Sequence, residues 1–501
     1  MPDAVVIGAG PNGLVAANLL ADAGWSVEVL ETQDRPGGAV KSGELVEPGF
    51  VNDQFSAFYP LAAASPVVRG LELERYGLEW AHGPRVLAHP AADGSCAVLS
   101  RDLDETAASL DAFAAGDGEA WRRLYGWWPR TGSALLGAMT TPFPPVRAGL
   151  RLSWTLRRDL LPFVRMGLLS VRRLADEHFR GPGGGRLLAG NAMHTDLLPE
   201  SAGGGFFGWF LTALGQTYGY PCARCGASRL TDALVRRLES RGGHVTCNAR
   251  VSGIVVEGGR ARAVRSAAGD VGAGKAILAD VHAVSLYLDL LPRQAVPNRV
   301  LRGIERFEHD PATLKVDWTL DGPIPWTAAD ARLAPVVHVT ESIDELSVSQ
   351  SEIARGLVPS APFLVVGQYS MADPTRMPGG KEVAWAYTHL PHGADPAGLA
   401  ERMEERLEAL APGFRGLVRK RRVWTPADLE AADESLIGGS LNGGTAQLHQ
   451  QLVFRPVPGL GRPETPVKGL YLASFSAHPG GGVHGGPGAI AARAALRRPR
   501  L

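Results

Sequence analysis

The ten residues AVVIGAGPNG, at positions 4–13, predict the fold of the amino-terminal part of the chain. The first four form an apolar run that is typical of a buried strand. The turn G-x-G-x-x-G follows at once, and residues 14–23 are then predicted to form a helix that ends before Gly24. A second strand is predicted at 26–30. This order of elements predicts an α/β fold with a Rossmann-like, dinucleotide-binding start.

The glycines of this turn have separate physical roles. Gly8 permits the tight turn, Gly10 lets backbone approach a pyrophosphate, and Gly13 lets the helix pack closely on the strand. Pro11 and Asn12 are candidate cofactor-binding residues in this turn, and the amino terminus of the helix that follows offers free N–H groups and a positive dipole end to phosphates. The alternative is a glycine-rich turn in an ordinary α/β domain.

An acidic residue and a second glycine pair follow the predicted unit. Glu31 lies 18 residues after Gly13, where a carboxylate accepts the ribose hydroxyls. With Arg35, Gly37 and Gly38 it forms the pattern E-x₃-R-x-G-G. Here the sequence resembles a large flavoprotein superfamily that includes amine oxidases, carotenoid desaturases and Rab GDP-dissociation inhibitors. The resemblance implies FAD as the cofactor, with the arginine and paired glycines along its pyrophosphate and ribityl chain.

A second glycine cluster, at 480–488, lies near the carboxyl end of the chain. A strand is predicted before it at 469–474, and an Ala-rich helix after it at 489–497. The cluster also contains G-x-G-x-x-G, so a second nucleotide site is an alternative. We exclude that alternative because the last acidic residue is Glu464 and no strand follows the cluster.

The resemblance implies a different role for this carboxyl-terminal segment. In the superfamily it returns to the FAD domain and passes beside the isoalloxazine ring. Gly481, Gly482 and Val483 are therefore expected against the flavin, and Ser474 toward the ribityl chain. The last helix is expected to point its amino terminus at the flavin N1–C2 carbonyl, where a positive dipole end stabilises the anionic reduced flavin.

More of the chain is similar to one branch, the phytoene-desaturase-related oxidoreductases that include pyridine nucleotide-disulphide oxidoreductase domain-containing protein 2. The similarity lies in the segments 48–66, 218–230, 313–316 and 373–388. One departure is CARCG at 222–226, where relatives have a glycine-rich turn. Its two cysteines are either a redox dithiol or, as we favour, an incidental pair in a loop.

The middle of the chain indicates two interleaved domains. We expect a discontinuous FAD-binding domain and a substrate domain with a mixed sheet and helices. Backbone near Val251 is expected to flank the adenine, as the resemblance implies. Residues 313–320 alternate between apolar and polar and predict a half-buried strand. The predicted FAD-binding domain comprises 1–100, 225–300 and 461–501, and the substrate domain comprises 101–224 and 301–460.

Hydride transfer to flavin N5 requires orientation of the substrate and exclusion of water, and the sequence shows no catalytic triad, metal-ligand cluster or carboxylate pair. We therefore expect no metal. His478 and His484 flank the second glycine cluster and are candidate catalytic residues; the alternative is a loop histidine bonded to backbone. Lys315 is the third candidate, because a strand lysine holds a water near N5 in the amine oxidases. Its simpler interpretation is the polar face of a strand.

Composition limits the partners. The 501 residues carry 51 basic and 51 acidic side chains, so a nucleic-acid binder is not expected. Four cysteines are too few for a disulfide framework and favour a cytoplasmic protein. Residues 142–180 hold eight arginines against three acids and predict either peripheral contact with an anionic membrane or a solvated face. The aromatic group at 206–210 predicts core packing or the wall of an apolar tunnel.

These observations predict an FAD-dependent oxidoreductase, a dehydrogenase, desaturase or oxidase acting on a lipophilic or secondary-metabolite substrate. Oxygen or a quinone would reoxidise the flavin, because no pyridine-nucleotide site is found. The enzyme alternative is an amine or amino-acid oxidase. The non-enzymatic alternative is a binding module like the GDP-dissociation inhibitors, which have this fold without flavin chemistry. The oligomeric state is left open.

Overall fold

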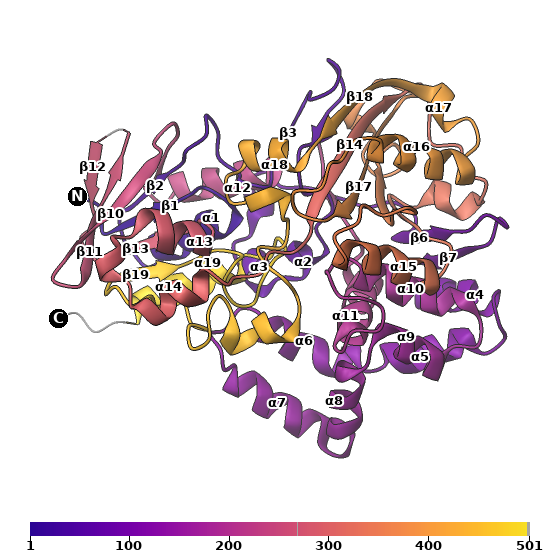
Figure 1. Ribbon diagram of the computed structural model, residues 1–501, viewed down its shortest axis with the longest axis horizontal. Helices are drawn as coiled ribbons and strands as arrows, with labels where there is room; N and C mark the ends of the chain where they lie inside the picture. The colour runs from indigo at the N-terminus through magenta and orange to yellow at the C-terminus, as the bar shows by residue number, and fades with distance from the viewer. Residues whose placement is uncertain (268, 498–501) are drawn as a thin grey trace.

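The computed structural model describes residues 1–267 and 269–497, and it consists of two lobes (Figure 1). The nucleotide lobe contains both ends of the described chain, and the second lobe contains a large sheet with helices on it. The predicted α/β class, with a Rossmann-like domain, is confirmed. No helix among the described residues is long and apolar enough to cross a membrane.

The nucleotide lobe is built on a five-stranded sheet whose paired strands are all parallel. The first two strands and the helix between them match the predicted unit. The other three strands come from distant parts of the sequence. Two of them are short, fully buried apolar runs, as is typical of parallel sheets, and the third, at one edge, is partly exposed. In sheet order, the strands are β19 (Leu470–Leu472), β13 (Ala276–Ala279), β1 (Ala4–Ile7), β2 (Val27–Leu30) and β9 (His244–Thr246).

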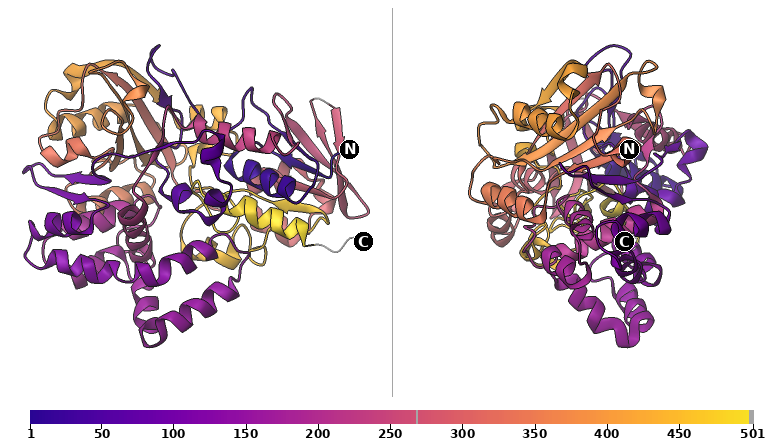
Figure 2. Two further views of the ribbon diagram at one scale, coloured as in Figure 1. Left: turned by 180° about the vertical axis from the view of Figure 1, so that it is seen from behind. Right: turned by 90° about the vertical axis from the view of Figure 1, so that its right-hand side faces the viewer.

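Three helices cover one face of this sheet: α1 (Pro11–Asp22), α12 (Ser228–Glu239) and α19 (Gly486–Leu496). The first and last helices lie side by side in both views (Figures 1 and 2). A Cβ added to Gly488 would lie 2.0 Å from the Asn12 carbonyl oxygen, and one added to Gly485 would lie 2.9 Å from the Val15 side chain. Glycine therefore allows the two ends of the chain to pack in direct contact.

The second lobe is built on a seven-stranded mixed sheet. Its strands pair antiparallel except β15 with β6, which are parallel. Strands β6 and β7 join this sheet, so the chain has already crossed to the second lobe before the predicted boundary at residue 100. In sheet order, the strands are β18 (Val418–Trp424), β14 (Ala312–Leu320), β17 (Glu382–Leu390), β16 (Leu364–Gln368), β15 (Val336–Val339), β6 (Leu87–Pro90) and β7 (Cys96–Leu99).

Strand β14 corrects one prediction. Every residue from Ala312 to Leu320 is buried, so the strand is not half-buried. The reason is its central position between β17 and β18, with its polar face also covered. Its polar side chains are satisfied inside the protein: Lys315 Nζ donates to Asp317 Oδ1 at 2.5 Å, and Thr319 Oγ1 donates to Glu47 Oε2 at 2.9 Å.

Helices complete the second lobe, and glycine again permits close packing. A Cβ on Gly183 would lie 2.3 Å from the Phe113 ring, and one on Gly208 would lie 2.6 Å from the Leu188 carbonyl oxygen. Helices α7 and α8 project from the lower edge of the molecule (Figure 1). The helices are α4 (Leu103–Asp111), α5 (Asp117–Tyr125), α6 (Trp128–Ala138), α7 (Val146–Leu156), α8 (Leu160–Leu168), α9 (Val171–His178), α10 (Pro182–Ala192) and α11 (Gly204–Tyr218).

Candidate functional site

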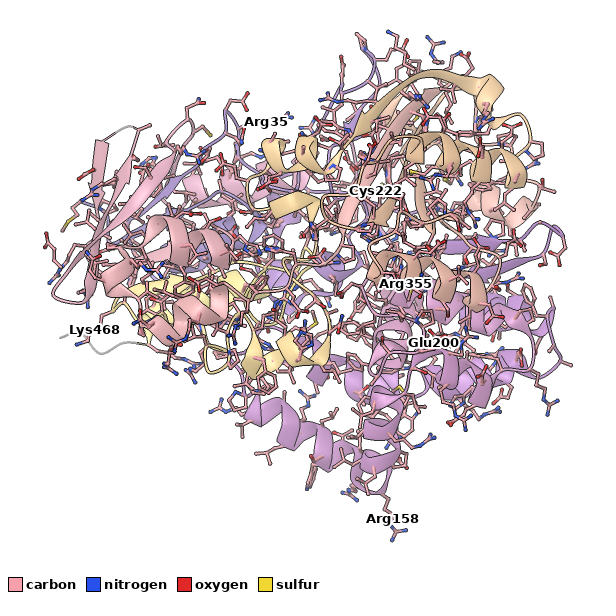
Figure 3. The ribbon with its side chains drawn as sticks, viewed as in Figure 1. Arg35, Arg158, Glu200, Cys222, Arg355 and Lys468 are labelled. Carbon is pink, nitrogen blue, oxygen red and sulfur yellow. The ribbon has the colours of Figure 1, made fainter. Side chains whose placement is uncertain are left out.

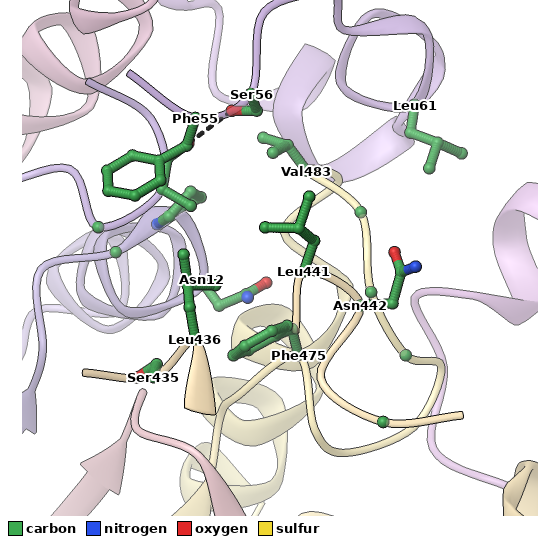
Figure 4. Close-up of a pocket in the computed structure, with 18 of the residues that line it drawn as sticks. Asn12, Phe55, Ser56, Leu61, Ser435, Leu436, Leu441, Asn442, Phe475 and Val483 are labelled. Atoms are coloured by element: carbon green, nitrogen blue, oxygen red, sulfur yellow. Dashed lines mark hydrogen bonds between the residues drawn. The ribbon is translucent and has the colours of Figure 1, made fainter. Parts of the chain in front are cut away.

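A cavity of about 1070 Å³ is lined by residues of both lobes. At one end it is lined by the glycine turn of β1–α1, and at the other by β14, β17 and α11. Figure 4 shows a close-up of it, with Phe55 and Asn12 from the amino-terminal region and Leu441 and Val483 from the carboxyl-terminal region among the lining residues. The cavity lies at the carboxyl edge of the parallel sheet, where open α/β folds bind their ligands.

The glycine turn forms a surface of bare backbone at the first end of the cavity. Gly8 has φ +90°, which side chains other than glycine rarely adopt. A Cβ on Gly10 would lie 2.7 Å from Asp280 Oδ2, and one on Gly13 would lie 2.2 Å from the Gly8 carbonyl oxygen. Most of the predicted turn residues line the cavity: Gly8, Gly10, Pro11 and Asn12. Gly13 does not line it and lies behind this surface.

Glu31 lies beside this surface at the end of β2. Its carboxylate accepts hydrogen bonds from the backbone N–H groups of Ala9 (2.7 Å) and Gln33 (3.0 Å), and it lines the cavity. These bonds hold the carboxylate against the turn while leaving acceptor capacity for ribose hydroxyls. Val251, expected near the adenine, lines the same end of the cavity.

The remaining residues of the E-x₃-R-x-G-G pattern have different positions. Gly38 lines the cavity, and a Cβ there would lie 3.1 Å from Gly10 Cα. Gly37 supports the turn from behind through its N–H bond to the Ala9 carbonyl (2.9 Å). Arg35 is exposed at the edge of the nucleotide lobe (Figure 3), where Nη1 donates to the Ser42 carbonyl at 3.1 Å, and it does not line the cavity.

Two further charged residues line this end of the cavity and were not predicted. Lys41 is buried and, within the described residues, makes no ion pair or side-chain hydrogen bond. Asp280 follows β13 directly, and burial raises the pKa of its carboxyl to about 8. The signal for Asp280 was present in the sequence: an acid at the carboxyl end of a strand parallel to β1 must lie at the ligand-binding edge.

The carboxyl-terminal glycine segment forms another part of the cavity wall. Gly481, Gly482 and Val483 line the cavity, and a Cβ on Gly481 would lie 2.7 Å from the Asn442 carbonyl oxygen. Ser474 lies outside the lining; it is fully buried, and its hydroxyl is 3.1 Å from that of Ser476.

The residues present fit a bound FAD. The two bare-backbone walls form the kind of surface that a dinucleotide can approach closely. Two buried polar atoms of lining residues, Asn12 Oδ1 and His478 Nε2, have no protein partner in the described chain. Such atoms are costly unless a ligand or water satisfies them. When bound, FAD would be held by the glycine turn, Glu31 and the carboxyl-terminal wall.

The two candidate histidines have different surroundings. His478 lines the cavity, and its pKa is lowered to about 4, mainly by burial. His484 does not line it; its Nδ1 accepts the Gly486 N–H at 3.0 Å, at the start of α19. Its pKa is also lowered to about 4, mainly by burial, so both rings are neutral at pH 7. The bond from Gly486 satisfies one of the free N–H groups that the helix start was expected to present.

Lys315 lines the far end of the cavity but is already bonded to protein atoms. Besides Asp317, its Nζ donates to the Asp53 carbonyl at 3.0 Å, and its side chain is almost fully buried. Its ammonium lies 5.9 Å from the centroid of the Trp385 ring, which also lines the cavity.

The far end of the cavity is a mainly apolar chamber with a neutral polar patch. Phe206, Phe207 and Phe210 of α11 line it, whereas Trp209 is core, so the aromatic group serves both predicted roles. The polar patch is centred on His194, whose Nδ1 is 3.2 Å from the Tyr387 hydroxyl. Burial lowers the pKa of His194 to about 4.

Neither cysteine of the CARCG segment is paired. Cys222 is buried and Cys225 is exposed, and both are free thiols. Neither lines the cavity.

Comparison with known proteins agrees with this geometry. A family model for NAD(P)-binding Rossmann-like domains matches residues 6–85. The chain is 28% identical to pyridine nucleotide-disulfide oxidoreductase domain-containing protein 2 of Mus musculus, over 99% of this chain and 93% of that protein. It is 26% identical to a phytoene desaturase (lycopene-forming) of Pseudescherichia vulneris, over 98% and 97%. The solved cyclohexylamine oxidase of Brevibacterium oxydans has a similar fold, with a TM-score of 0.61 at 15% identity, over 99% and 100%.

The fold, the glycine-lined cavity and these relatives together define an FAD-dependent oxidoreductase, as the sequence predicted. Over nearly its full length the chain is similar in sequence to a carotenoid desaturase, and it shares its fold with an amine oxidase.

Proposed function

We propose that this enzyme dehydrogenates an elongated, uncharged, lipophilic substrate held in the chamber lined by α11 and β17. The observation that carries the proposal is the continuity of one cavity from the glycine turn to an aromatic chamber. Bound FAD supplies a hydride acceptor at flavin N5. One of the relatives is a phytoene desaturase, whose name describes a dehydrogenation of this kind. Oxygen or a quinone is the proposed acceptor that reoxidises the flavin.

The side chains of the chamber orient the substrate and exclude water in this proposal. Phe206, Phe207 and Phe210 supply apolar contact area. His194 and Tyr387 supply neutral hydrogen-bonding groups at one side. His478 holds a proton weakly at pH 7 because its pKa is about 4, so we assign it orientation of the cofactor rather than proton abstraction.

The charged side chains that line the cavity favour this proposal over an amine oxidase. The cavity-lining carboxylates of the described chain, Glu31, Asp280, Asp289, Asp433 and Glu434, include none from the strands or from α11, the elements that form the chamber. An ammonium substrate would therefore enter an apolar space without a counter-ion, which is costly. This favours an uncharged substrate over a charged amine.

The test is a substrate screen under anaerobic conditions. Polyenes, other uncharged lipids and amines are added to the purified protein, and bleaching of the flavin band near ~450 nm is followed. Bleaching by uncharged apolar compounds supports the proposal. Bleaching and peroxide release with amines alone would contradict it, and protein that takes up no FAD would favour a binding module.

We also propose that α7 and α8 contact an anionic membrane surface. Leu150, Trp154 and Leu161 are 66%, 76% and 77% exposed, which is unusual for such side chains. Arginines are interleaved with them, including Arg158 at the tip of the projection (Figure 3). Leu452 lines the cavity and is also about half exposed. Basic and apolar side chains together fit an anionic lipid surface.

A further inference from the structure

The carboxyl group of Asp280 lies against the glycine turn at the cavity. Oδ2 accepts the Gly13 N–H at 2.7 Å, and the Asp280 N–H donates to the Ile7 carbonyl at 2.8 Å. These bonds fix both ends of the residue beside β1 and α1. A Cβ on Gly10 would lie only 2.7 Å from the same Oδ2, and Asp280 lines the cavity.

The charged groups around Asp280 come from four neighbouring segments. Glu31 comes from the end of β2, and Asp433 follows α18 (Pro426–Ala432). Lys41 is the buried cation, and Arg250, also lining the cavity, is paired with Glu434. The amino terminus of α1 adds its N–H groups and positive dipole end. Acids therefore outnumber unpaired cations at the place where a doubly charged pyrophosphate is expected.

Three physical effects act on the pKa of the Asp280 carboxyl. Burial raises its pKa to about 8; the Gly13 N–H opposes this shift, and the charges of Asp433 and Glu31 reinforce it. A pyrophosphate diester keeps its negative charges throughout the neutral pH range. A carboxylate that shares a poorly hydrated site with another negative group takes up a proton, because both groups cannot stay charged at close range.

We propose that Asp280 is a proton-linked partner of the FAD pyrophosphate, so that the cofactor binds the form of the protein in which this carboxyl is protonated. The inference rests on the FAD site described above. The protonated carboxyl removes one negative charge from the site and gains an O–H donor for the phosphate-binding surface. Cofactor binding and proton uptake at Asp280 are then thermodynamically linked.

The sign of the pH dependence follows from this linkage. Below pH 8 most molecules already carry the proton, so FAD affinity is nearly constant. Above pH 8 each molecule must take up a proton on binding, and affinity falls toward tenfold per pH unit. Between pH 7 and pH 9.5 the expected loss is about 30-fold for one proton with an apo pKa near 8.

The experiment measures FAD binding to apo-protein by fluorescence titration from pH 6.5 to 9.5. It compares the unmodified protein with Asp280→Asn, which keeps an acceptor for the Gly13 N–H but cannot titrate. The matched control is Asp289→Asn, which removes an exposed carboxylate that also lines the cavity. The unmodified protein and Asp289→Asn should lose about 30-fold in affinity over this range, and Asp280→Asn should lose less than threefold. The titration of the flavin itself is common to all three and cancels.

Calorimetry at pH 9 in two buffers of different ionisation enthalpy gives the proton count directly. We expect uptake of about one proton per FAD for the unmodified protein and none for Asp280→Asn. The inference is overturned if FAD affinity falls equally with pH in the unmodified protein and in Asp280→Asn. It is also overturned if only Asp433→Asn removes this fall. So would an Asp280→Asn protein that is folded by circular dichroism yet binds no FAD. Unmodified protein that binds no FAD at any pH would instead contradict the cofactor assignment.

Discussion

Lys41 introduces a positive charge into a part of the cavity where carboxyl groups predominate. Because Lys41 forms no ion pair within the described chain, a bound phosphate would be its counter-ion. We expect Lys41→Met to weaken FAD binding about tenfold, the size of one charge-assisted hydrogen bond. Fluorescence titration of apo-protein measures this. Lys468→Met, which removes an exposed lysine outside the cavity, should bind FAD normally, and equal affinities in the two variants would remove Lys41 from the site.

Lys315 and Asp317 form a buried ion pair on β14. Replacement of Lys315 by Met leaves the Asp317 carboxylate buried without its cation, although the Trp424 N–H still donates to it. We expect Lys315→Met to lower the free energy of unfolding by about 3–5 kcal/mol, as for other broken buried pairs. Urea denaturation measures this loss. The double variant Lys315→Met with Asp317→Asn should recover most of it, and a double variant as unstable as the single one would contradict this account.

At the scale of elements, the contact between α1 and α19 depends on glycine. A Cβ on Gly488 would lie 2.0 Å from the Asn12 carbonyl oxygen, so Gly488→Ala must push the two helices apart. We expect a loss of about 1–3 kcal/mol in stability, as for other overpacked sites, together with a reduced FAD content. Thermal melting and the flavin-to-protein absorbance ratio measure the two effects. Gly149→Ala in α7, where a Cβ meets nothing within 4 Å, should retain both.

Elements differed in how well local sequence predicted them. The β1–α1–β2 unit was predicted because its periodicity and glycine spacing are properties of neighbouring residues. Strand β14 was correctly predicted as a strand, but the prediction that it is half-buried was wrong. Burial of its polar face depends on distant segments, such as the one that holds Glu47. The position of Arg35 likewise depends on the Ser42 carbonyl, which its motif does not specify.

At the scale of the whole molecule, the projection formed by α7 and α8 belongs to the second lobe, which also holds the proposed substrate chamber. We expect the protein to co-sediment with vesicles that contain anionic lipid and to stay in solution with zwitterionic vesicles. The triple variant Leu150→Ser, Trp154→Ser and Leu161→Ser should lose this binding and keep its FAD, because all three side chains are mostly exposed. Co-sedimentation that does not depend on anionic lipid would contradict the proposed contact.

The sequence by itself determined the α/β class, the dinucleotide turn and the resemblance to a flavoprotein superfamily, because these reside in short contiguous patterns with strict spacing. It also predicted that the two glycine clusters contact one cofactor, and in the structure residues of both clusters line one cavity. Only the tertiary structure decided which polar groups face that cavity. Lys41 and Asp433 converge there from separate segments, whereas His484 and Arg35 bond elsewhere. Electrostatics depends on distance and burial, and these are set by packing between segments far apart in the chain.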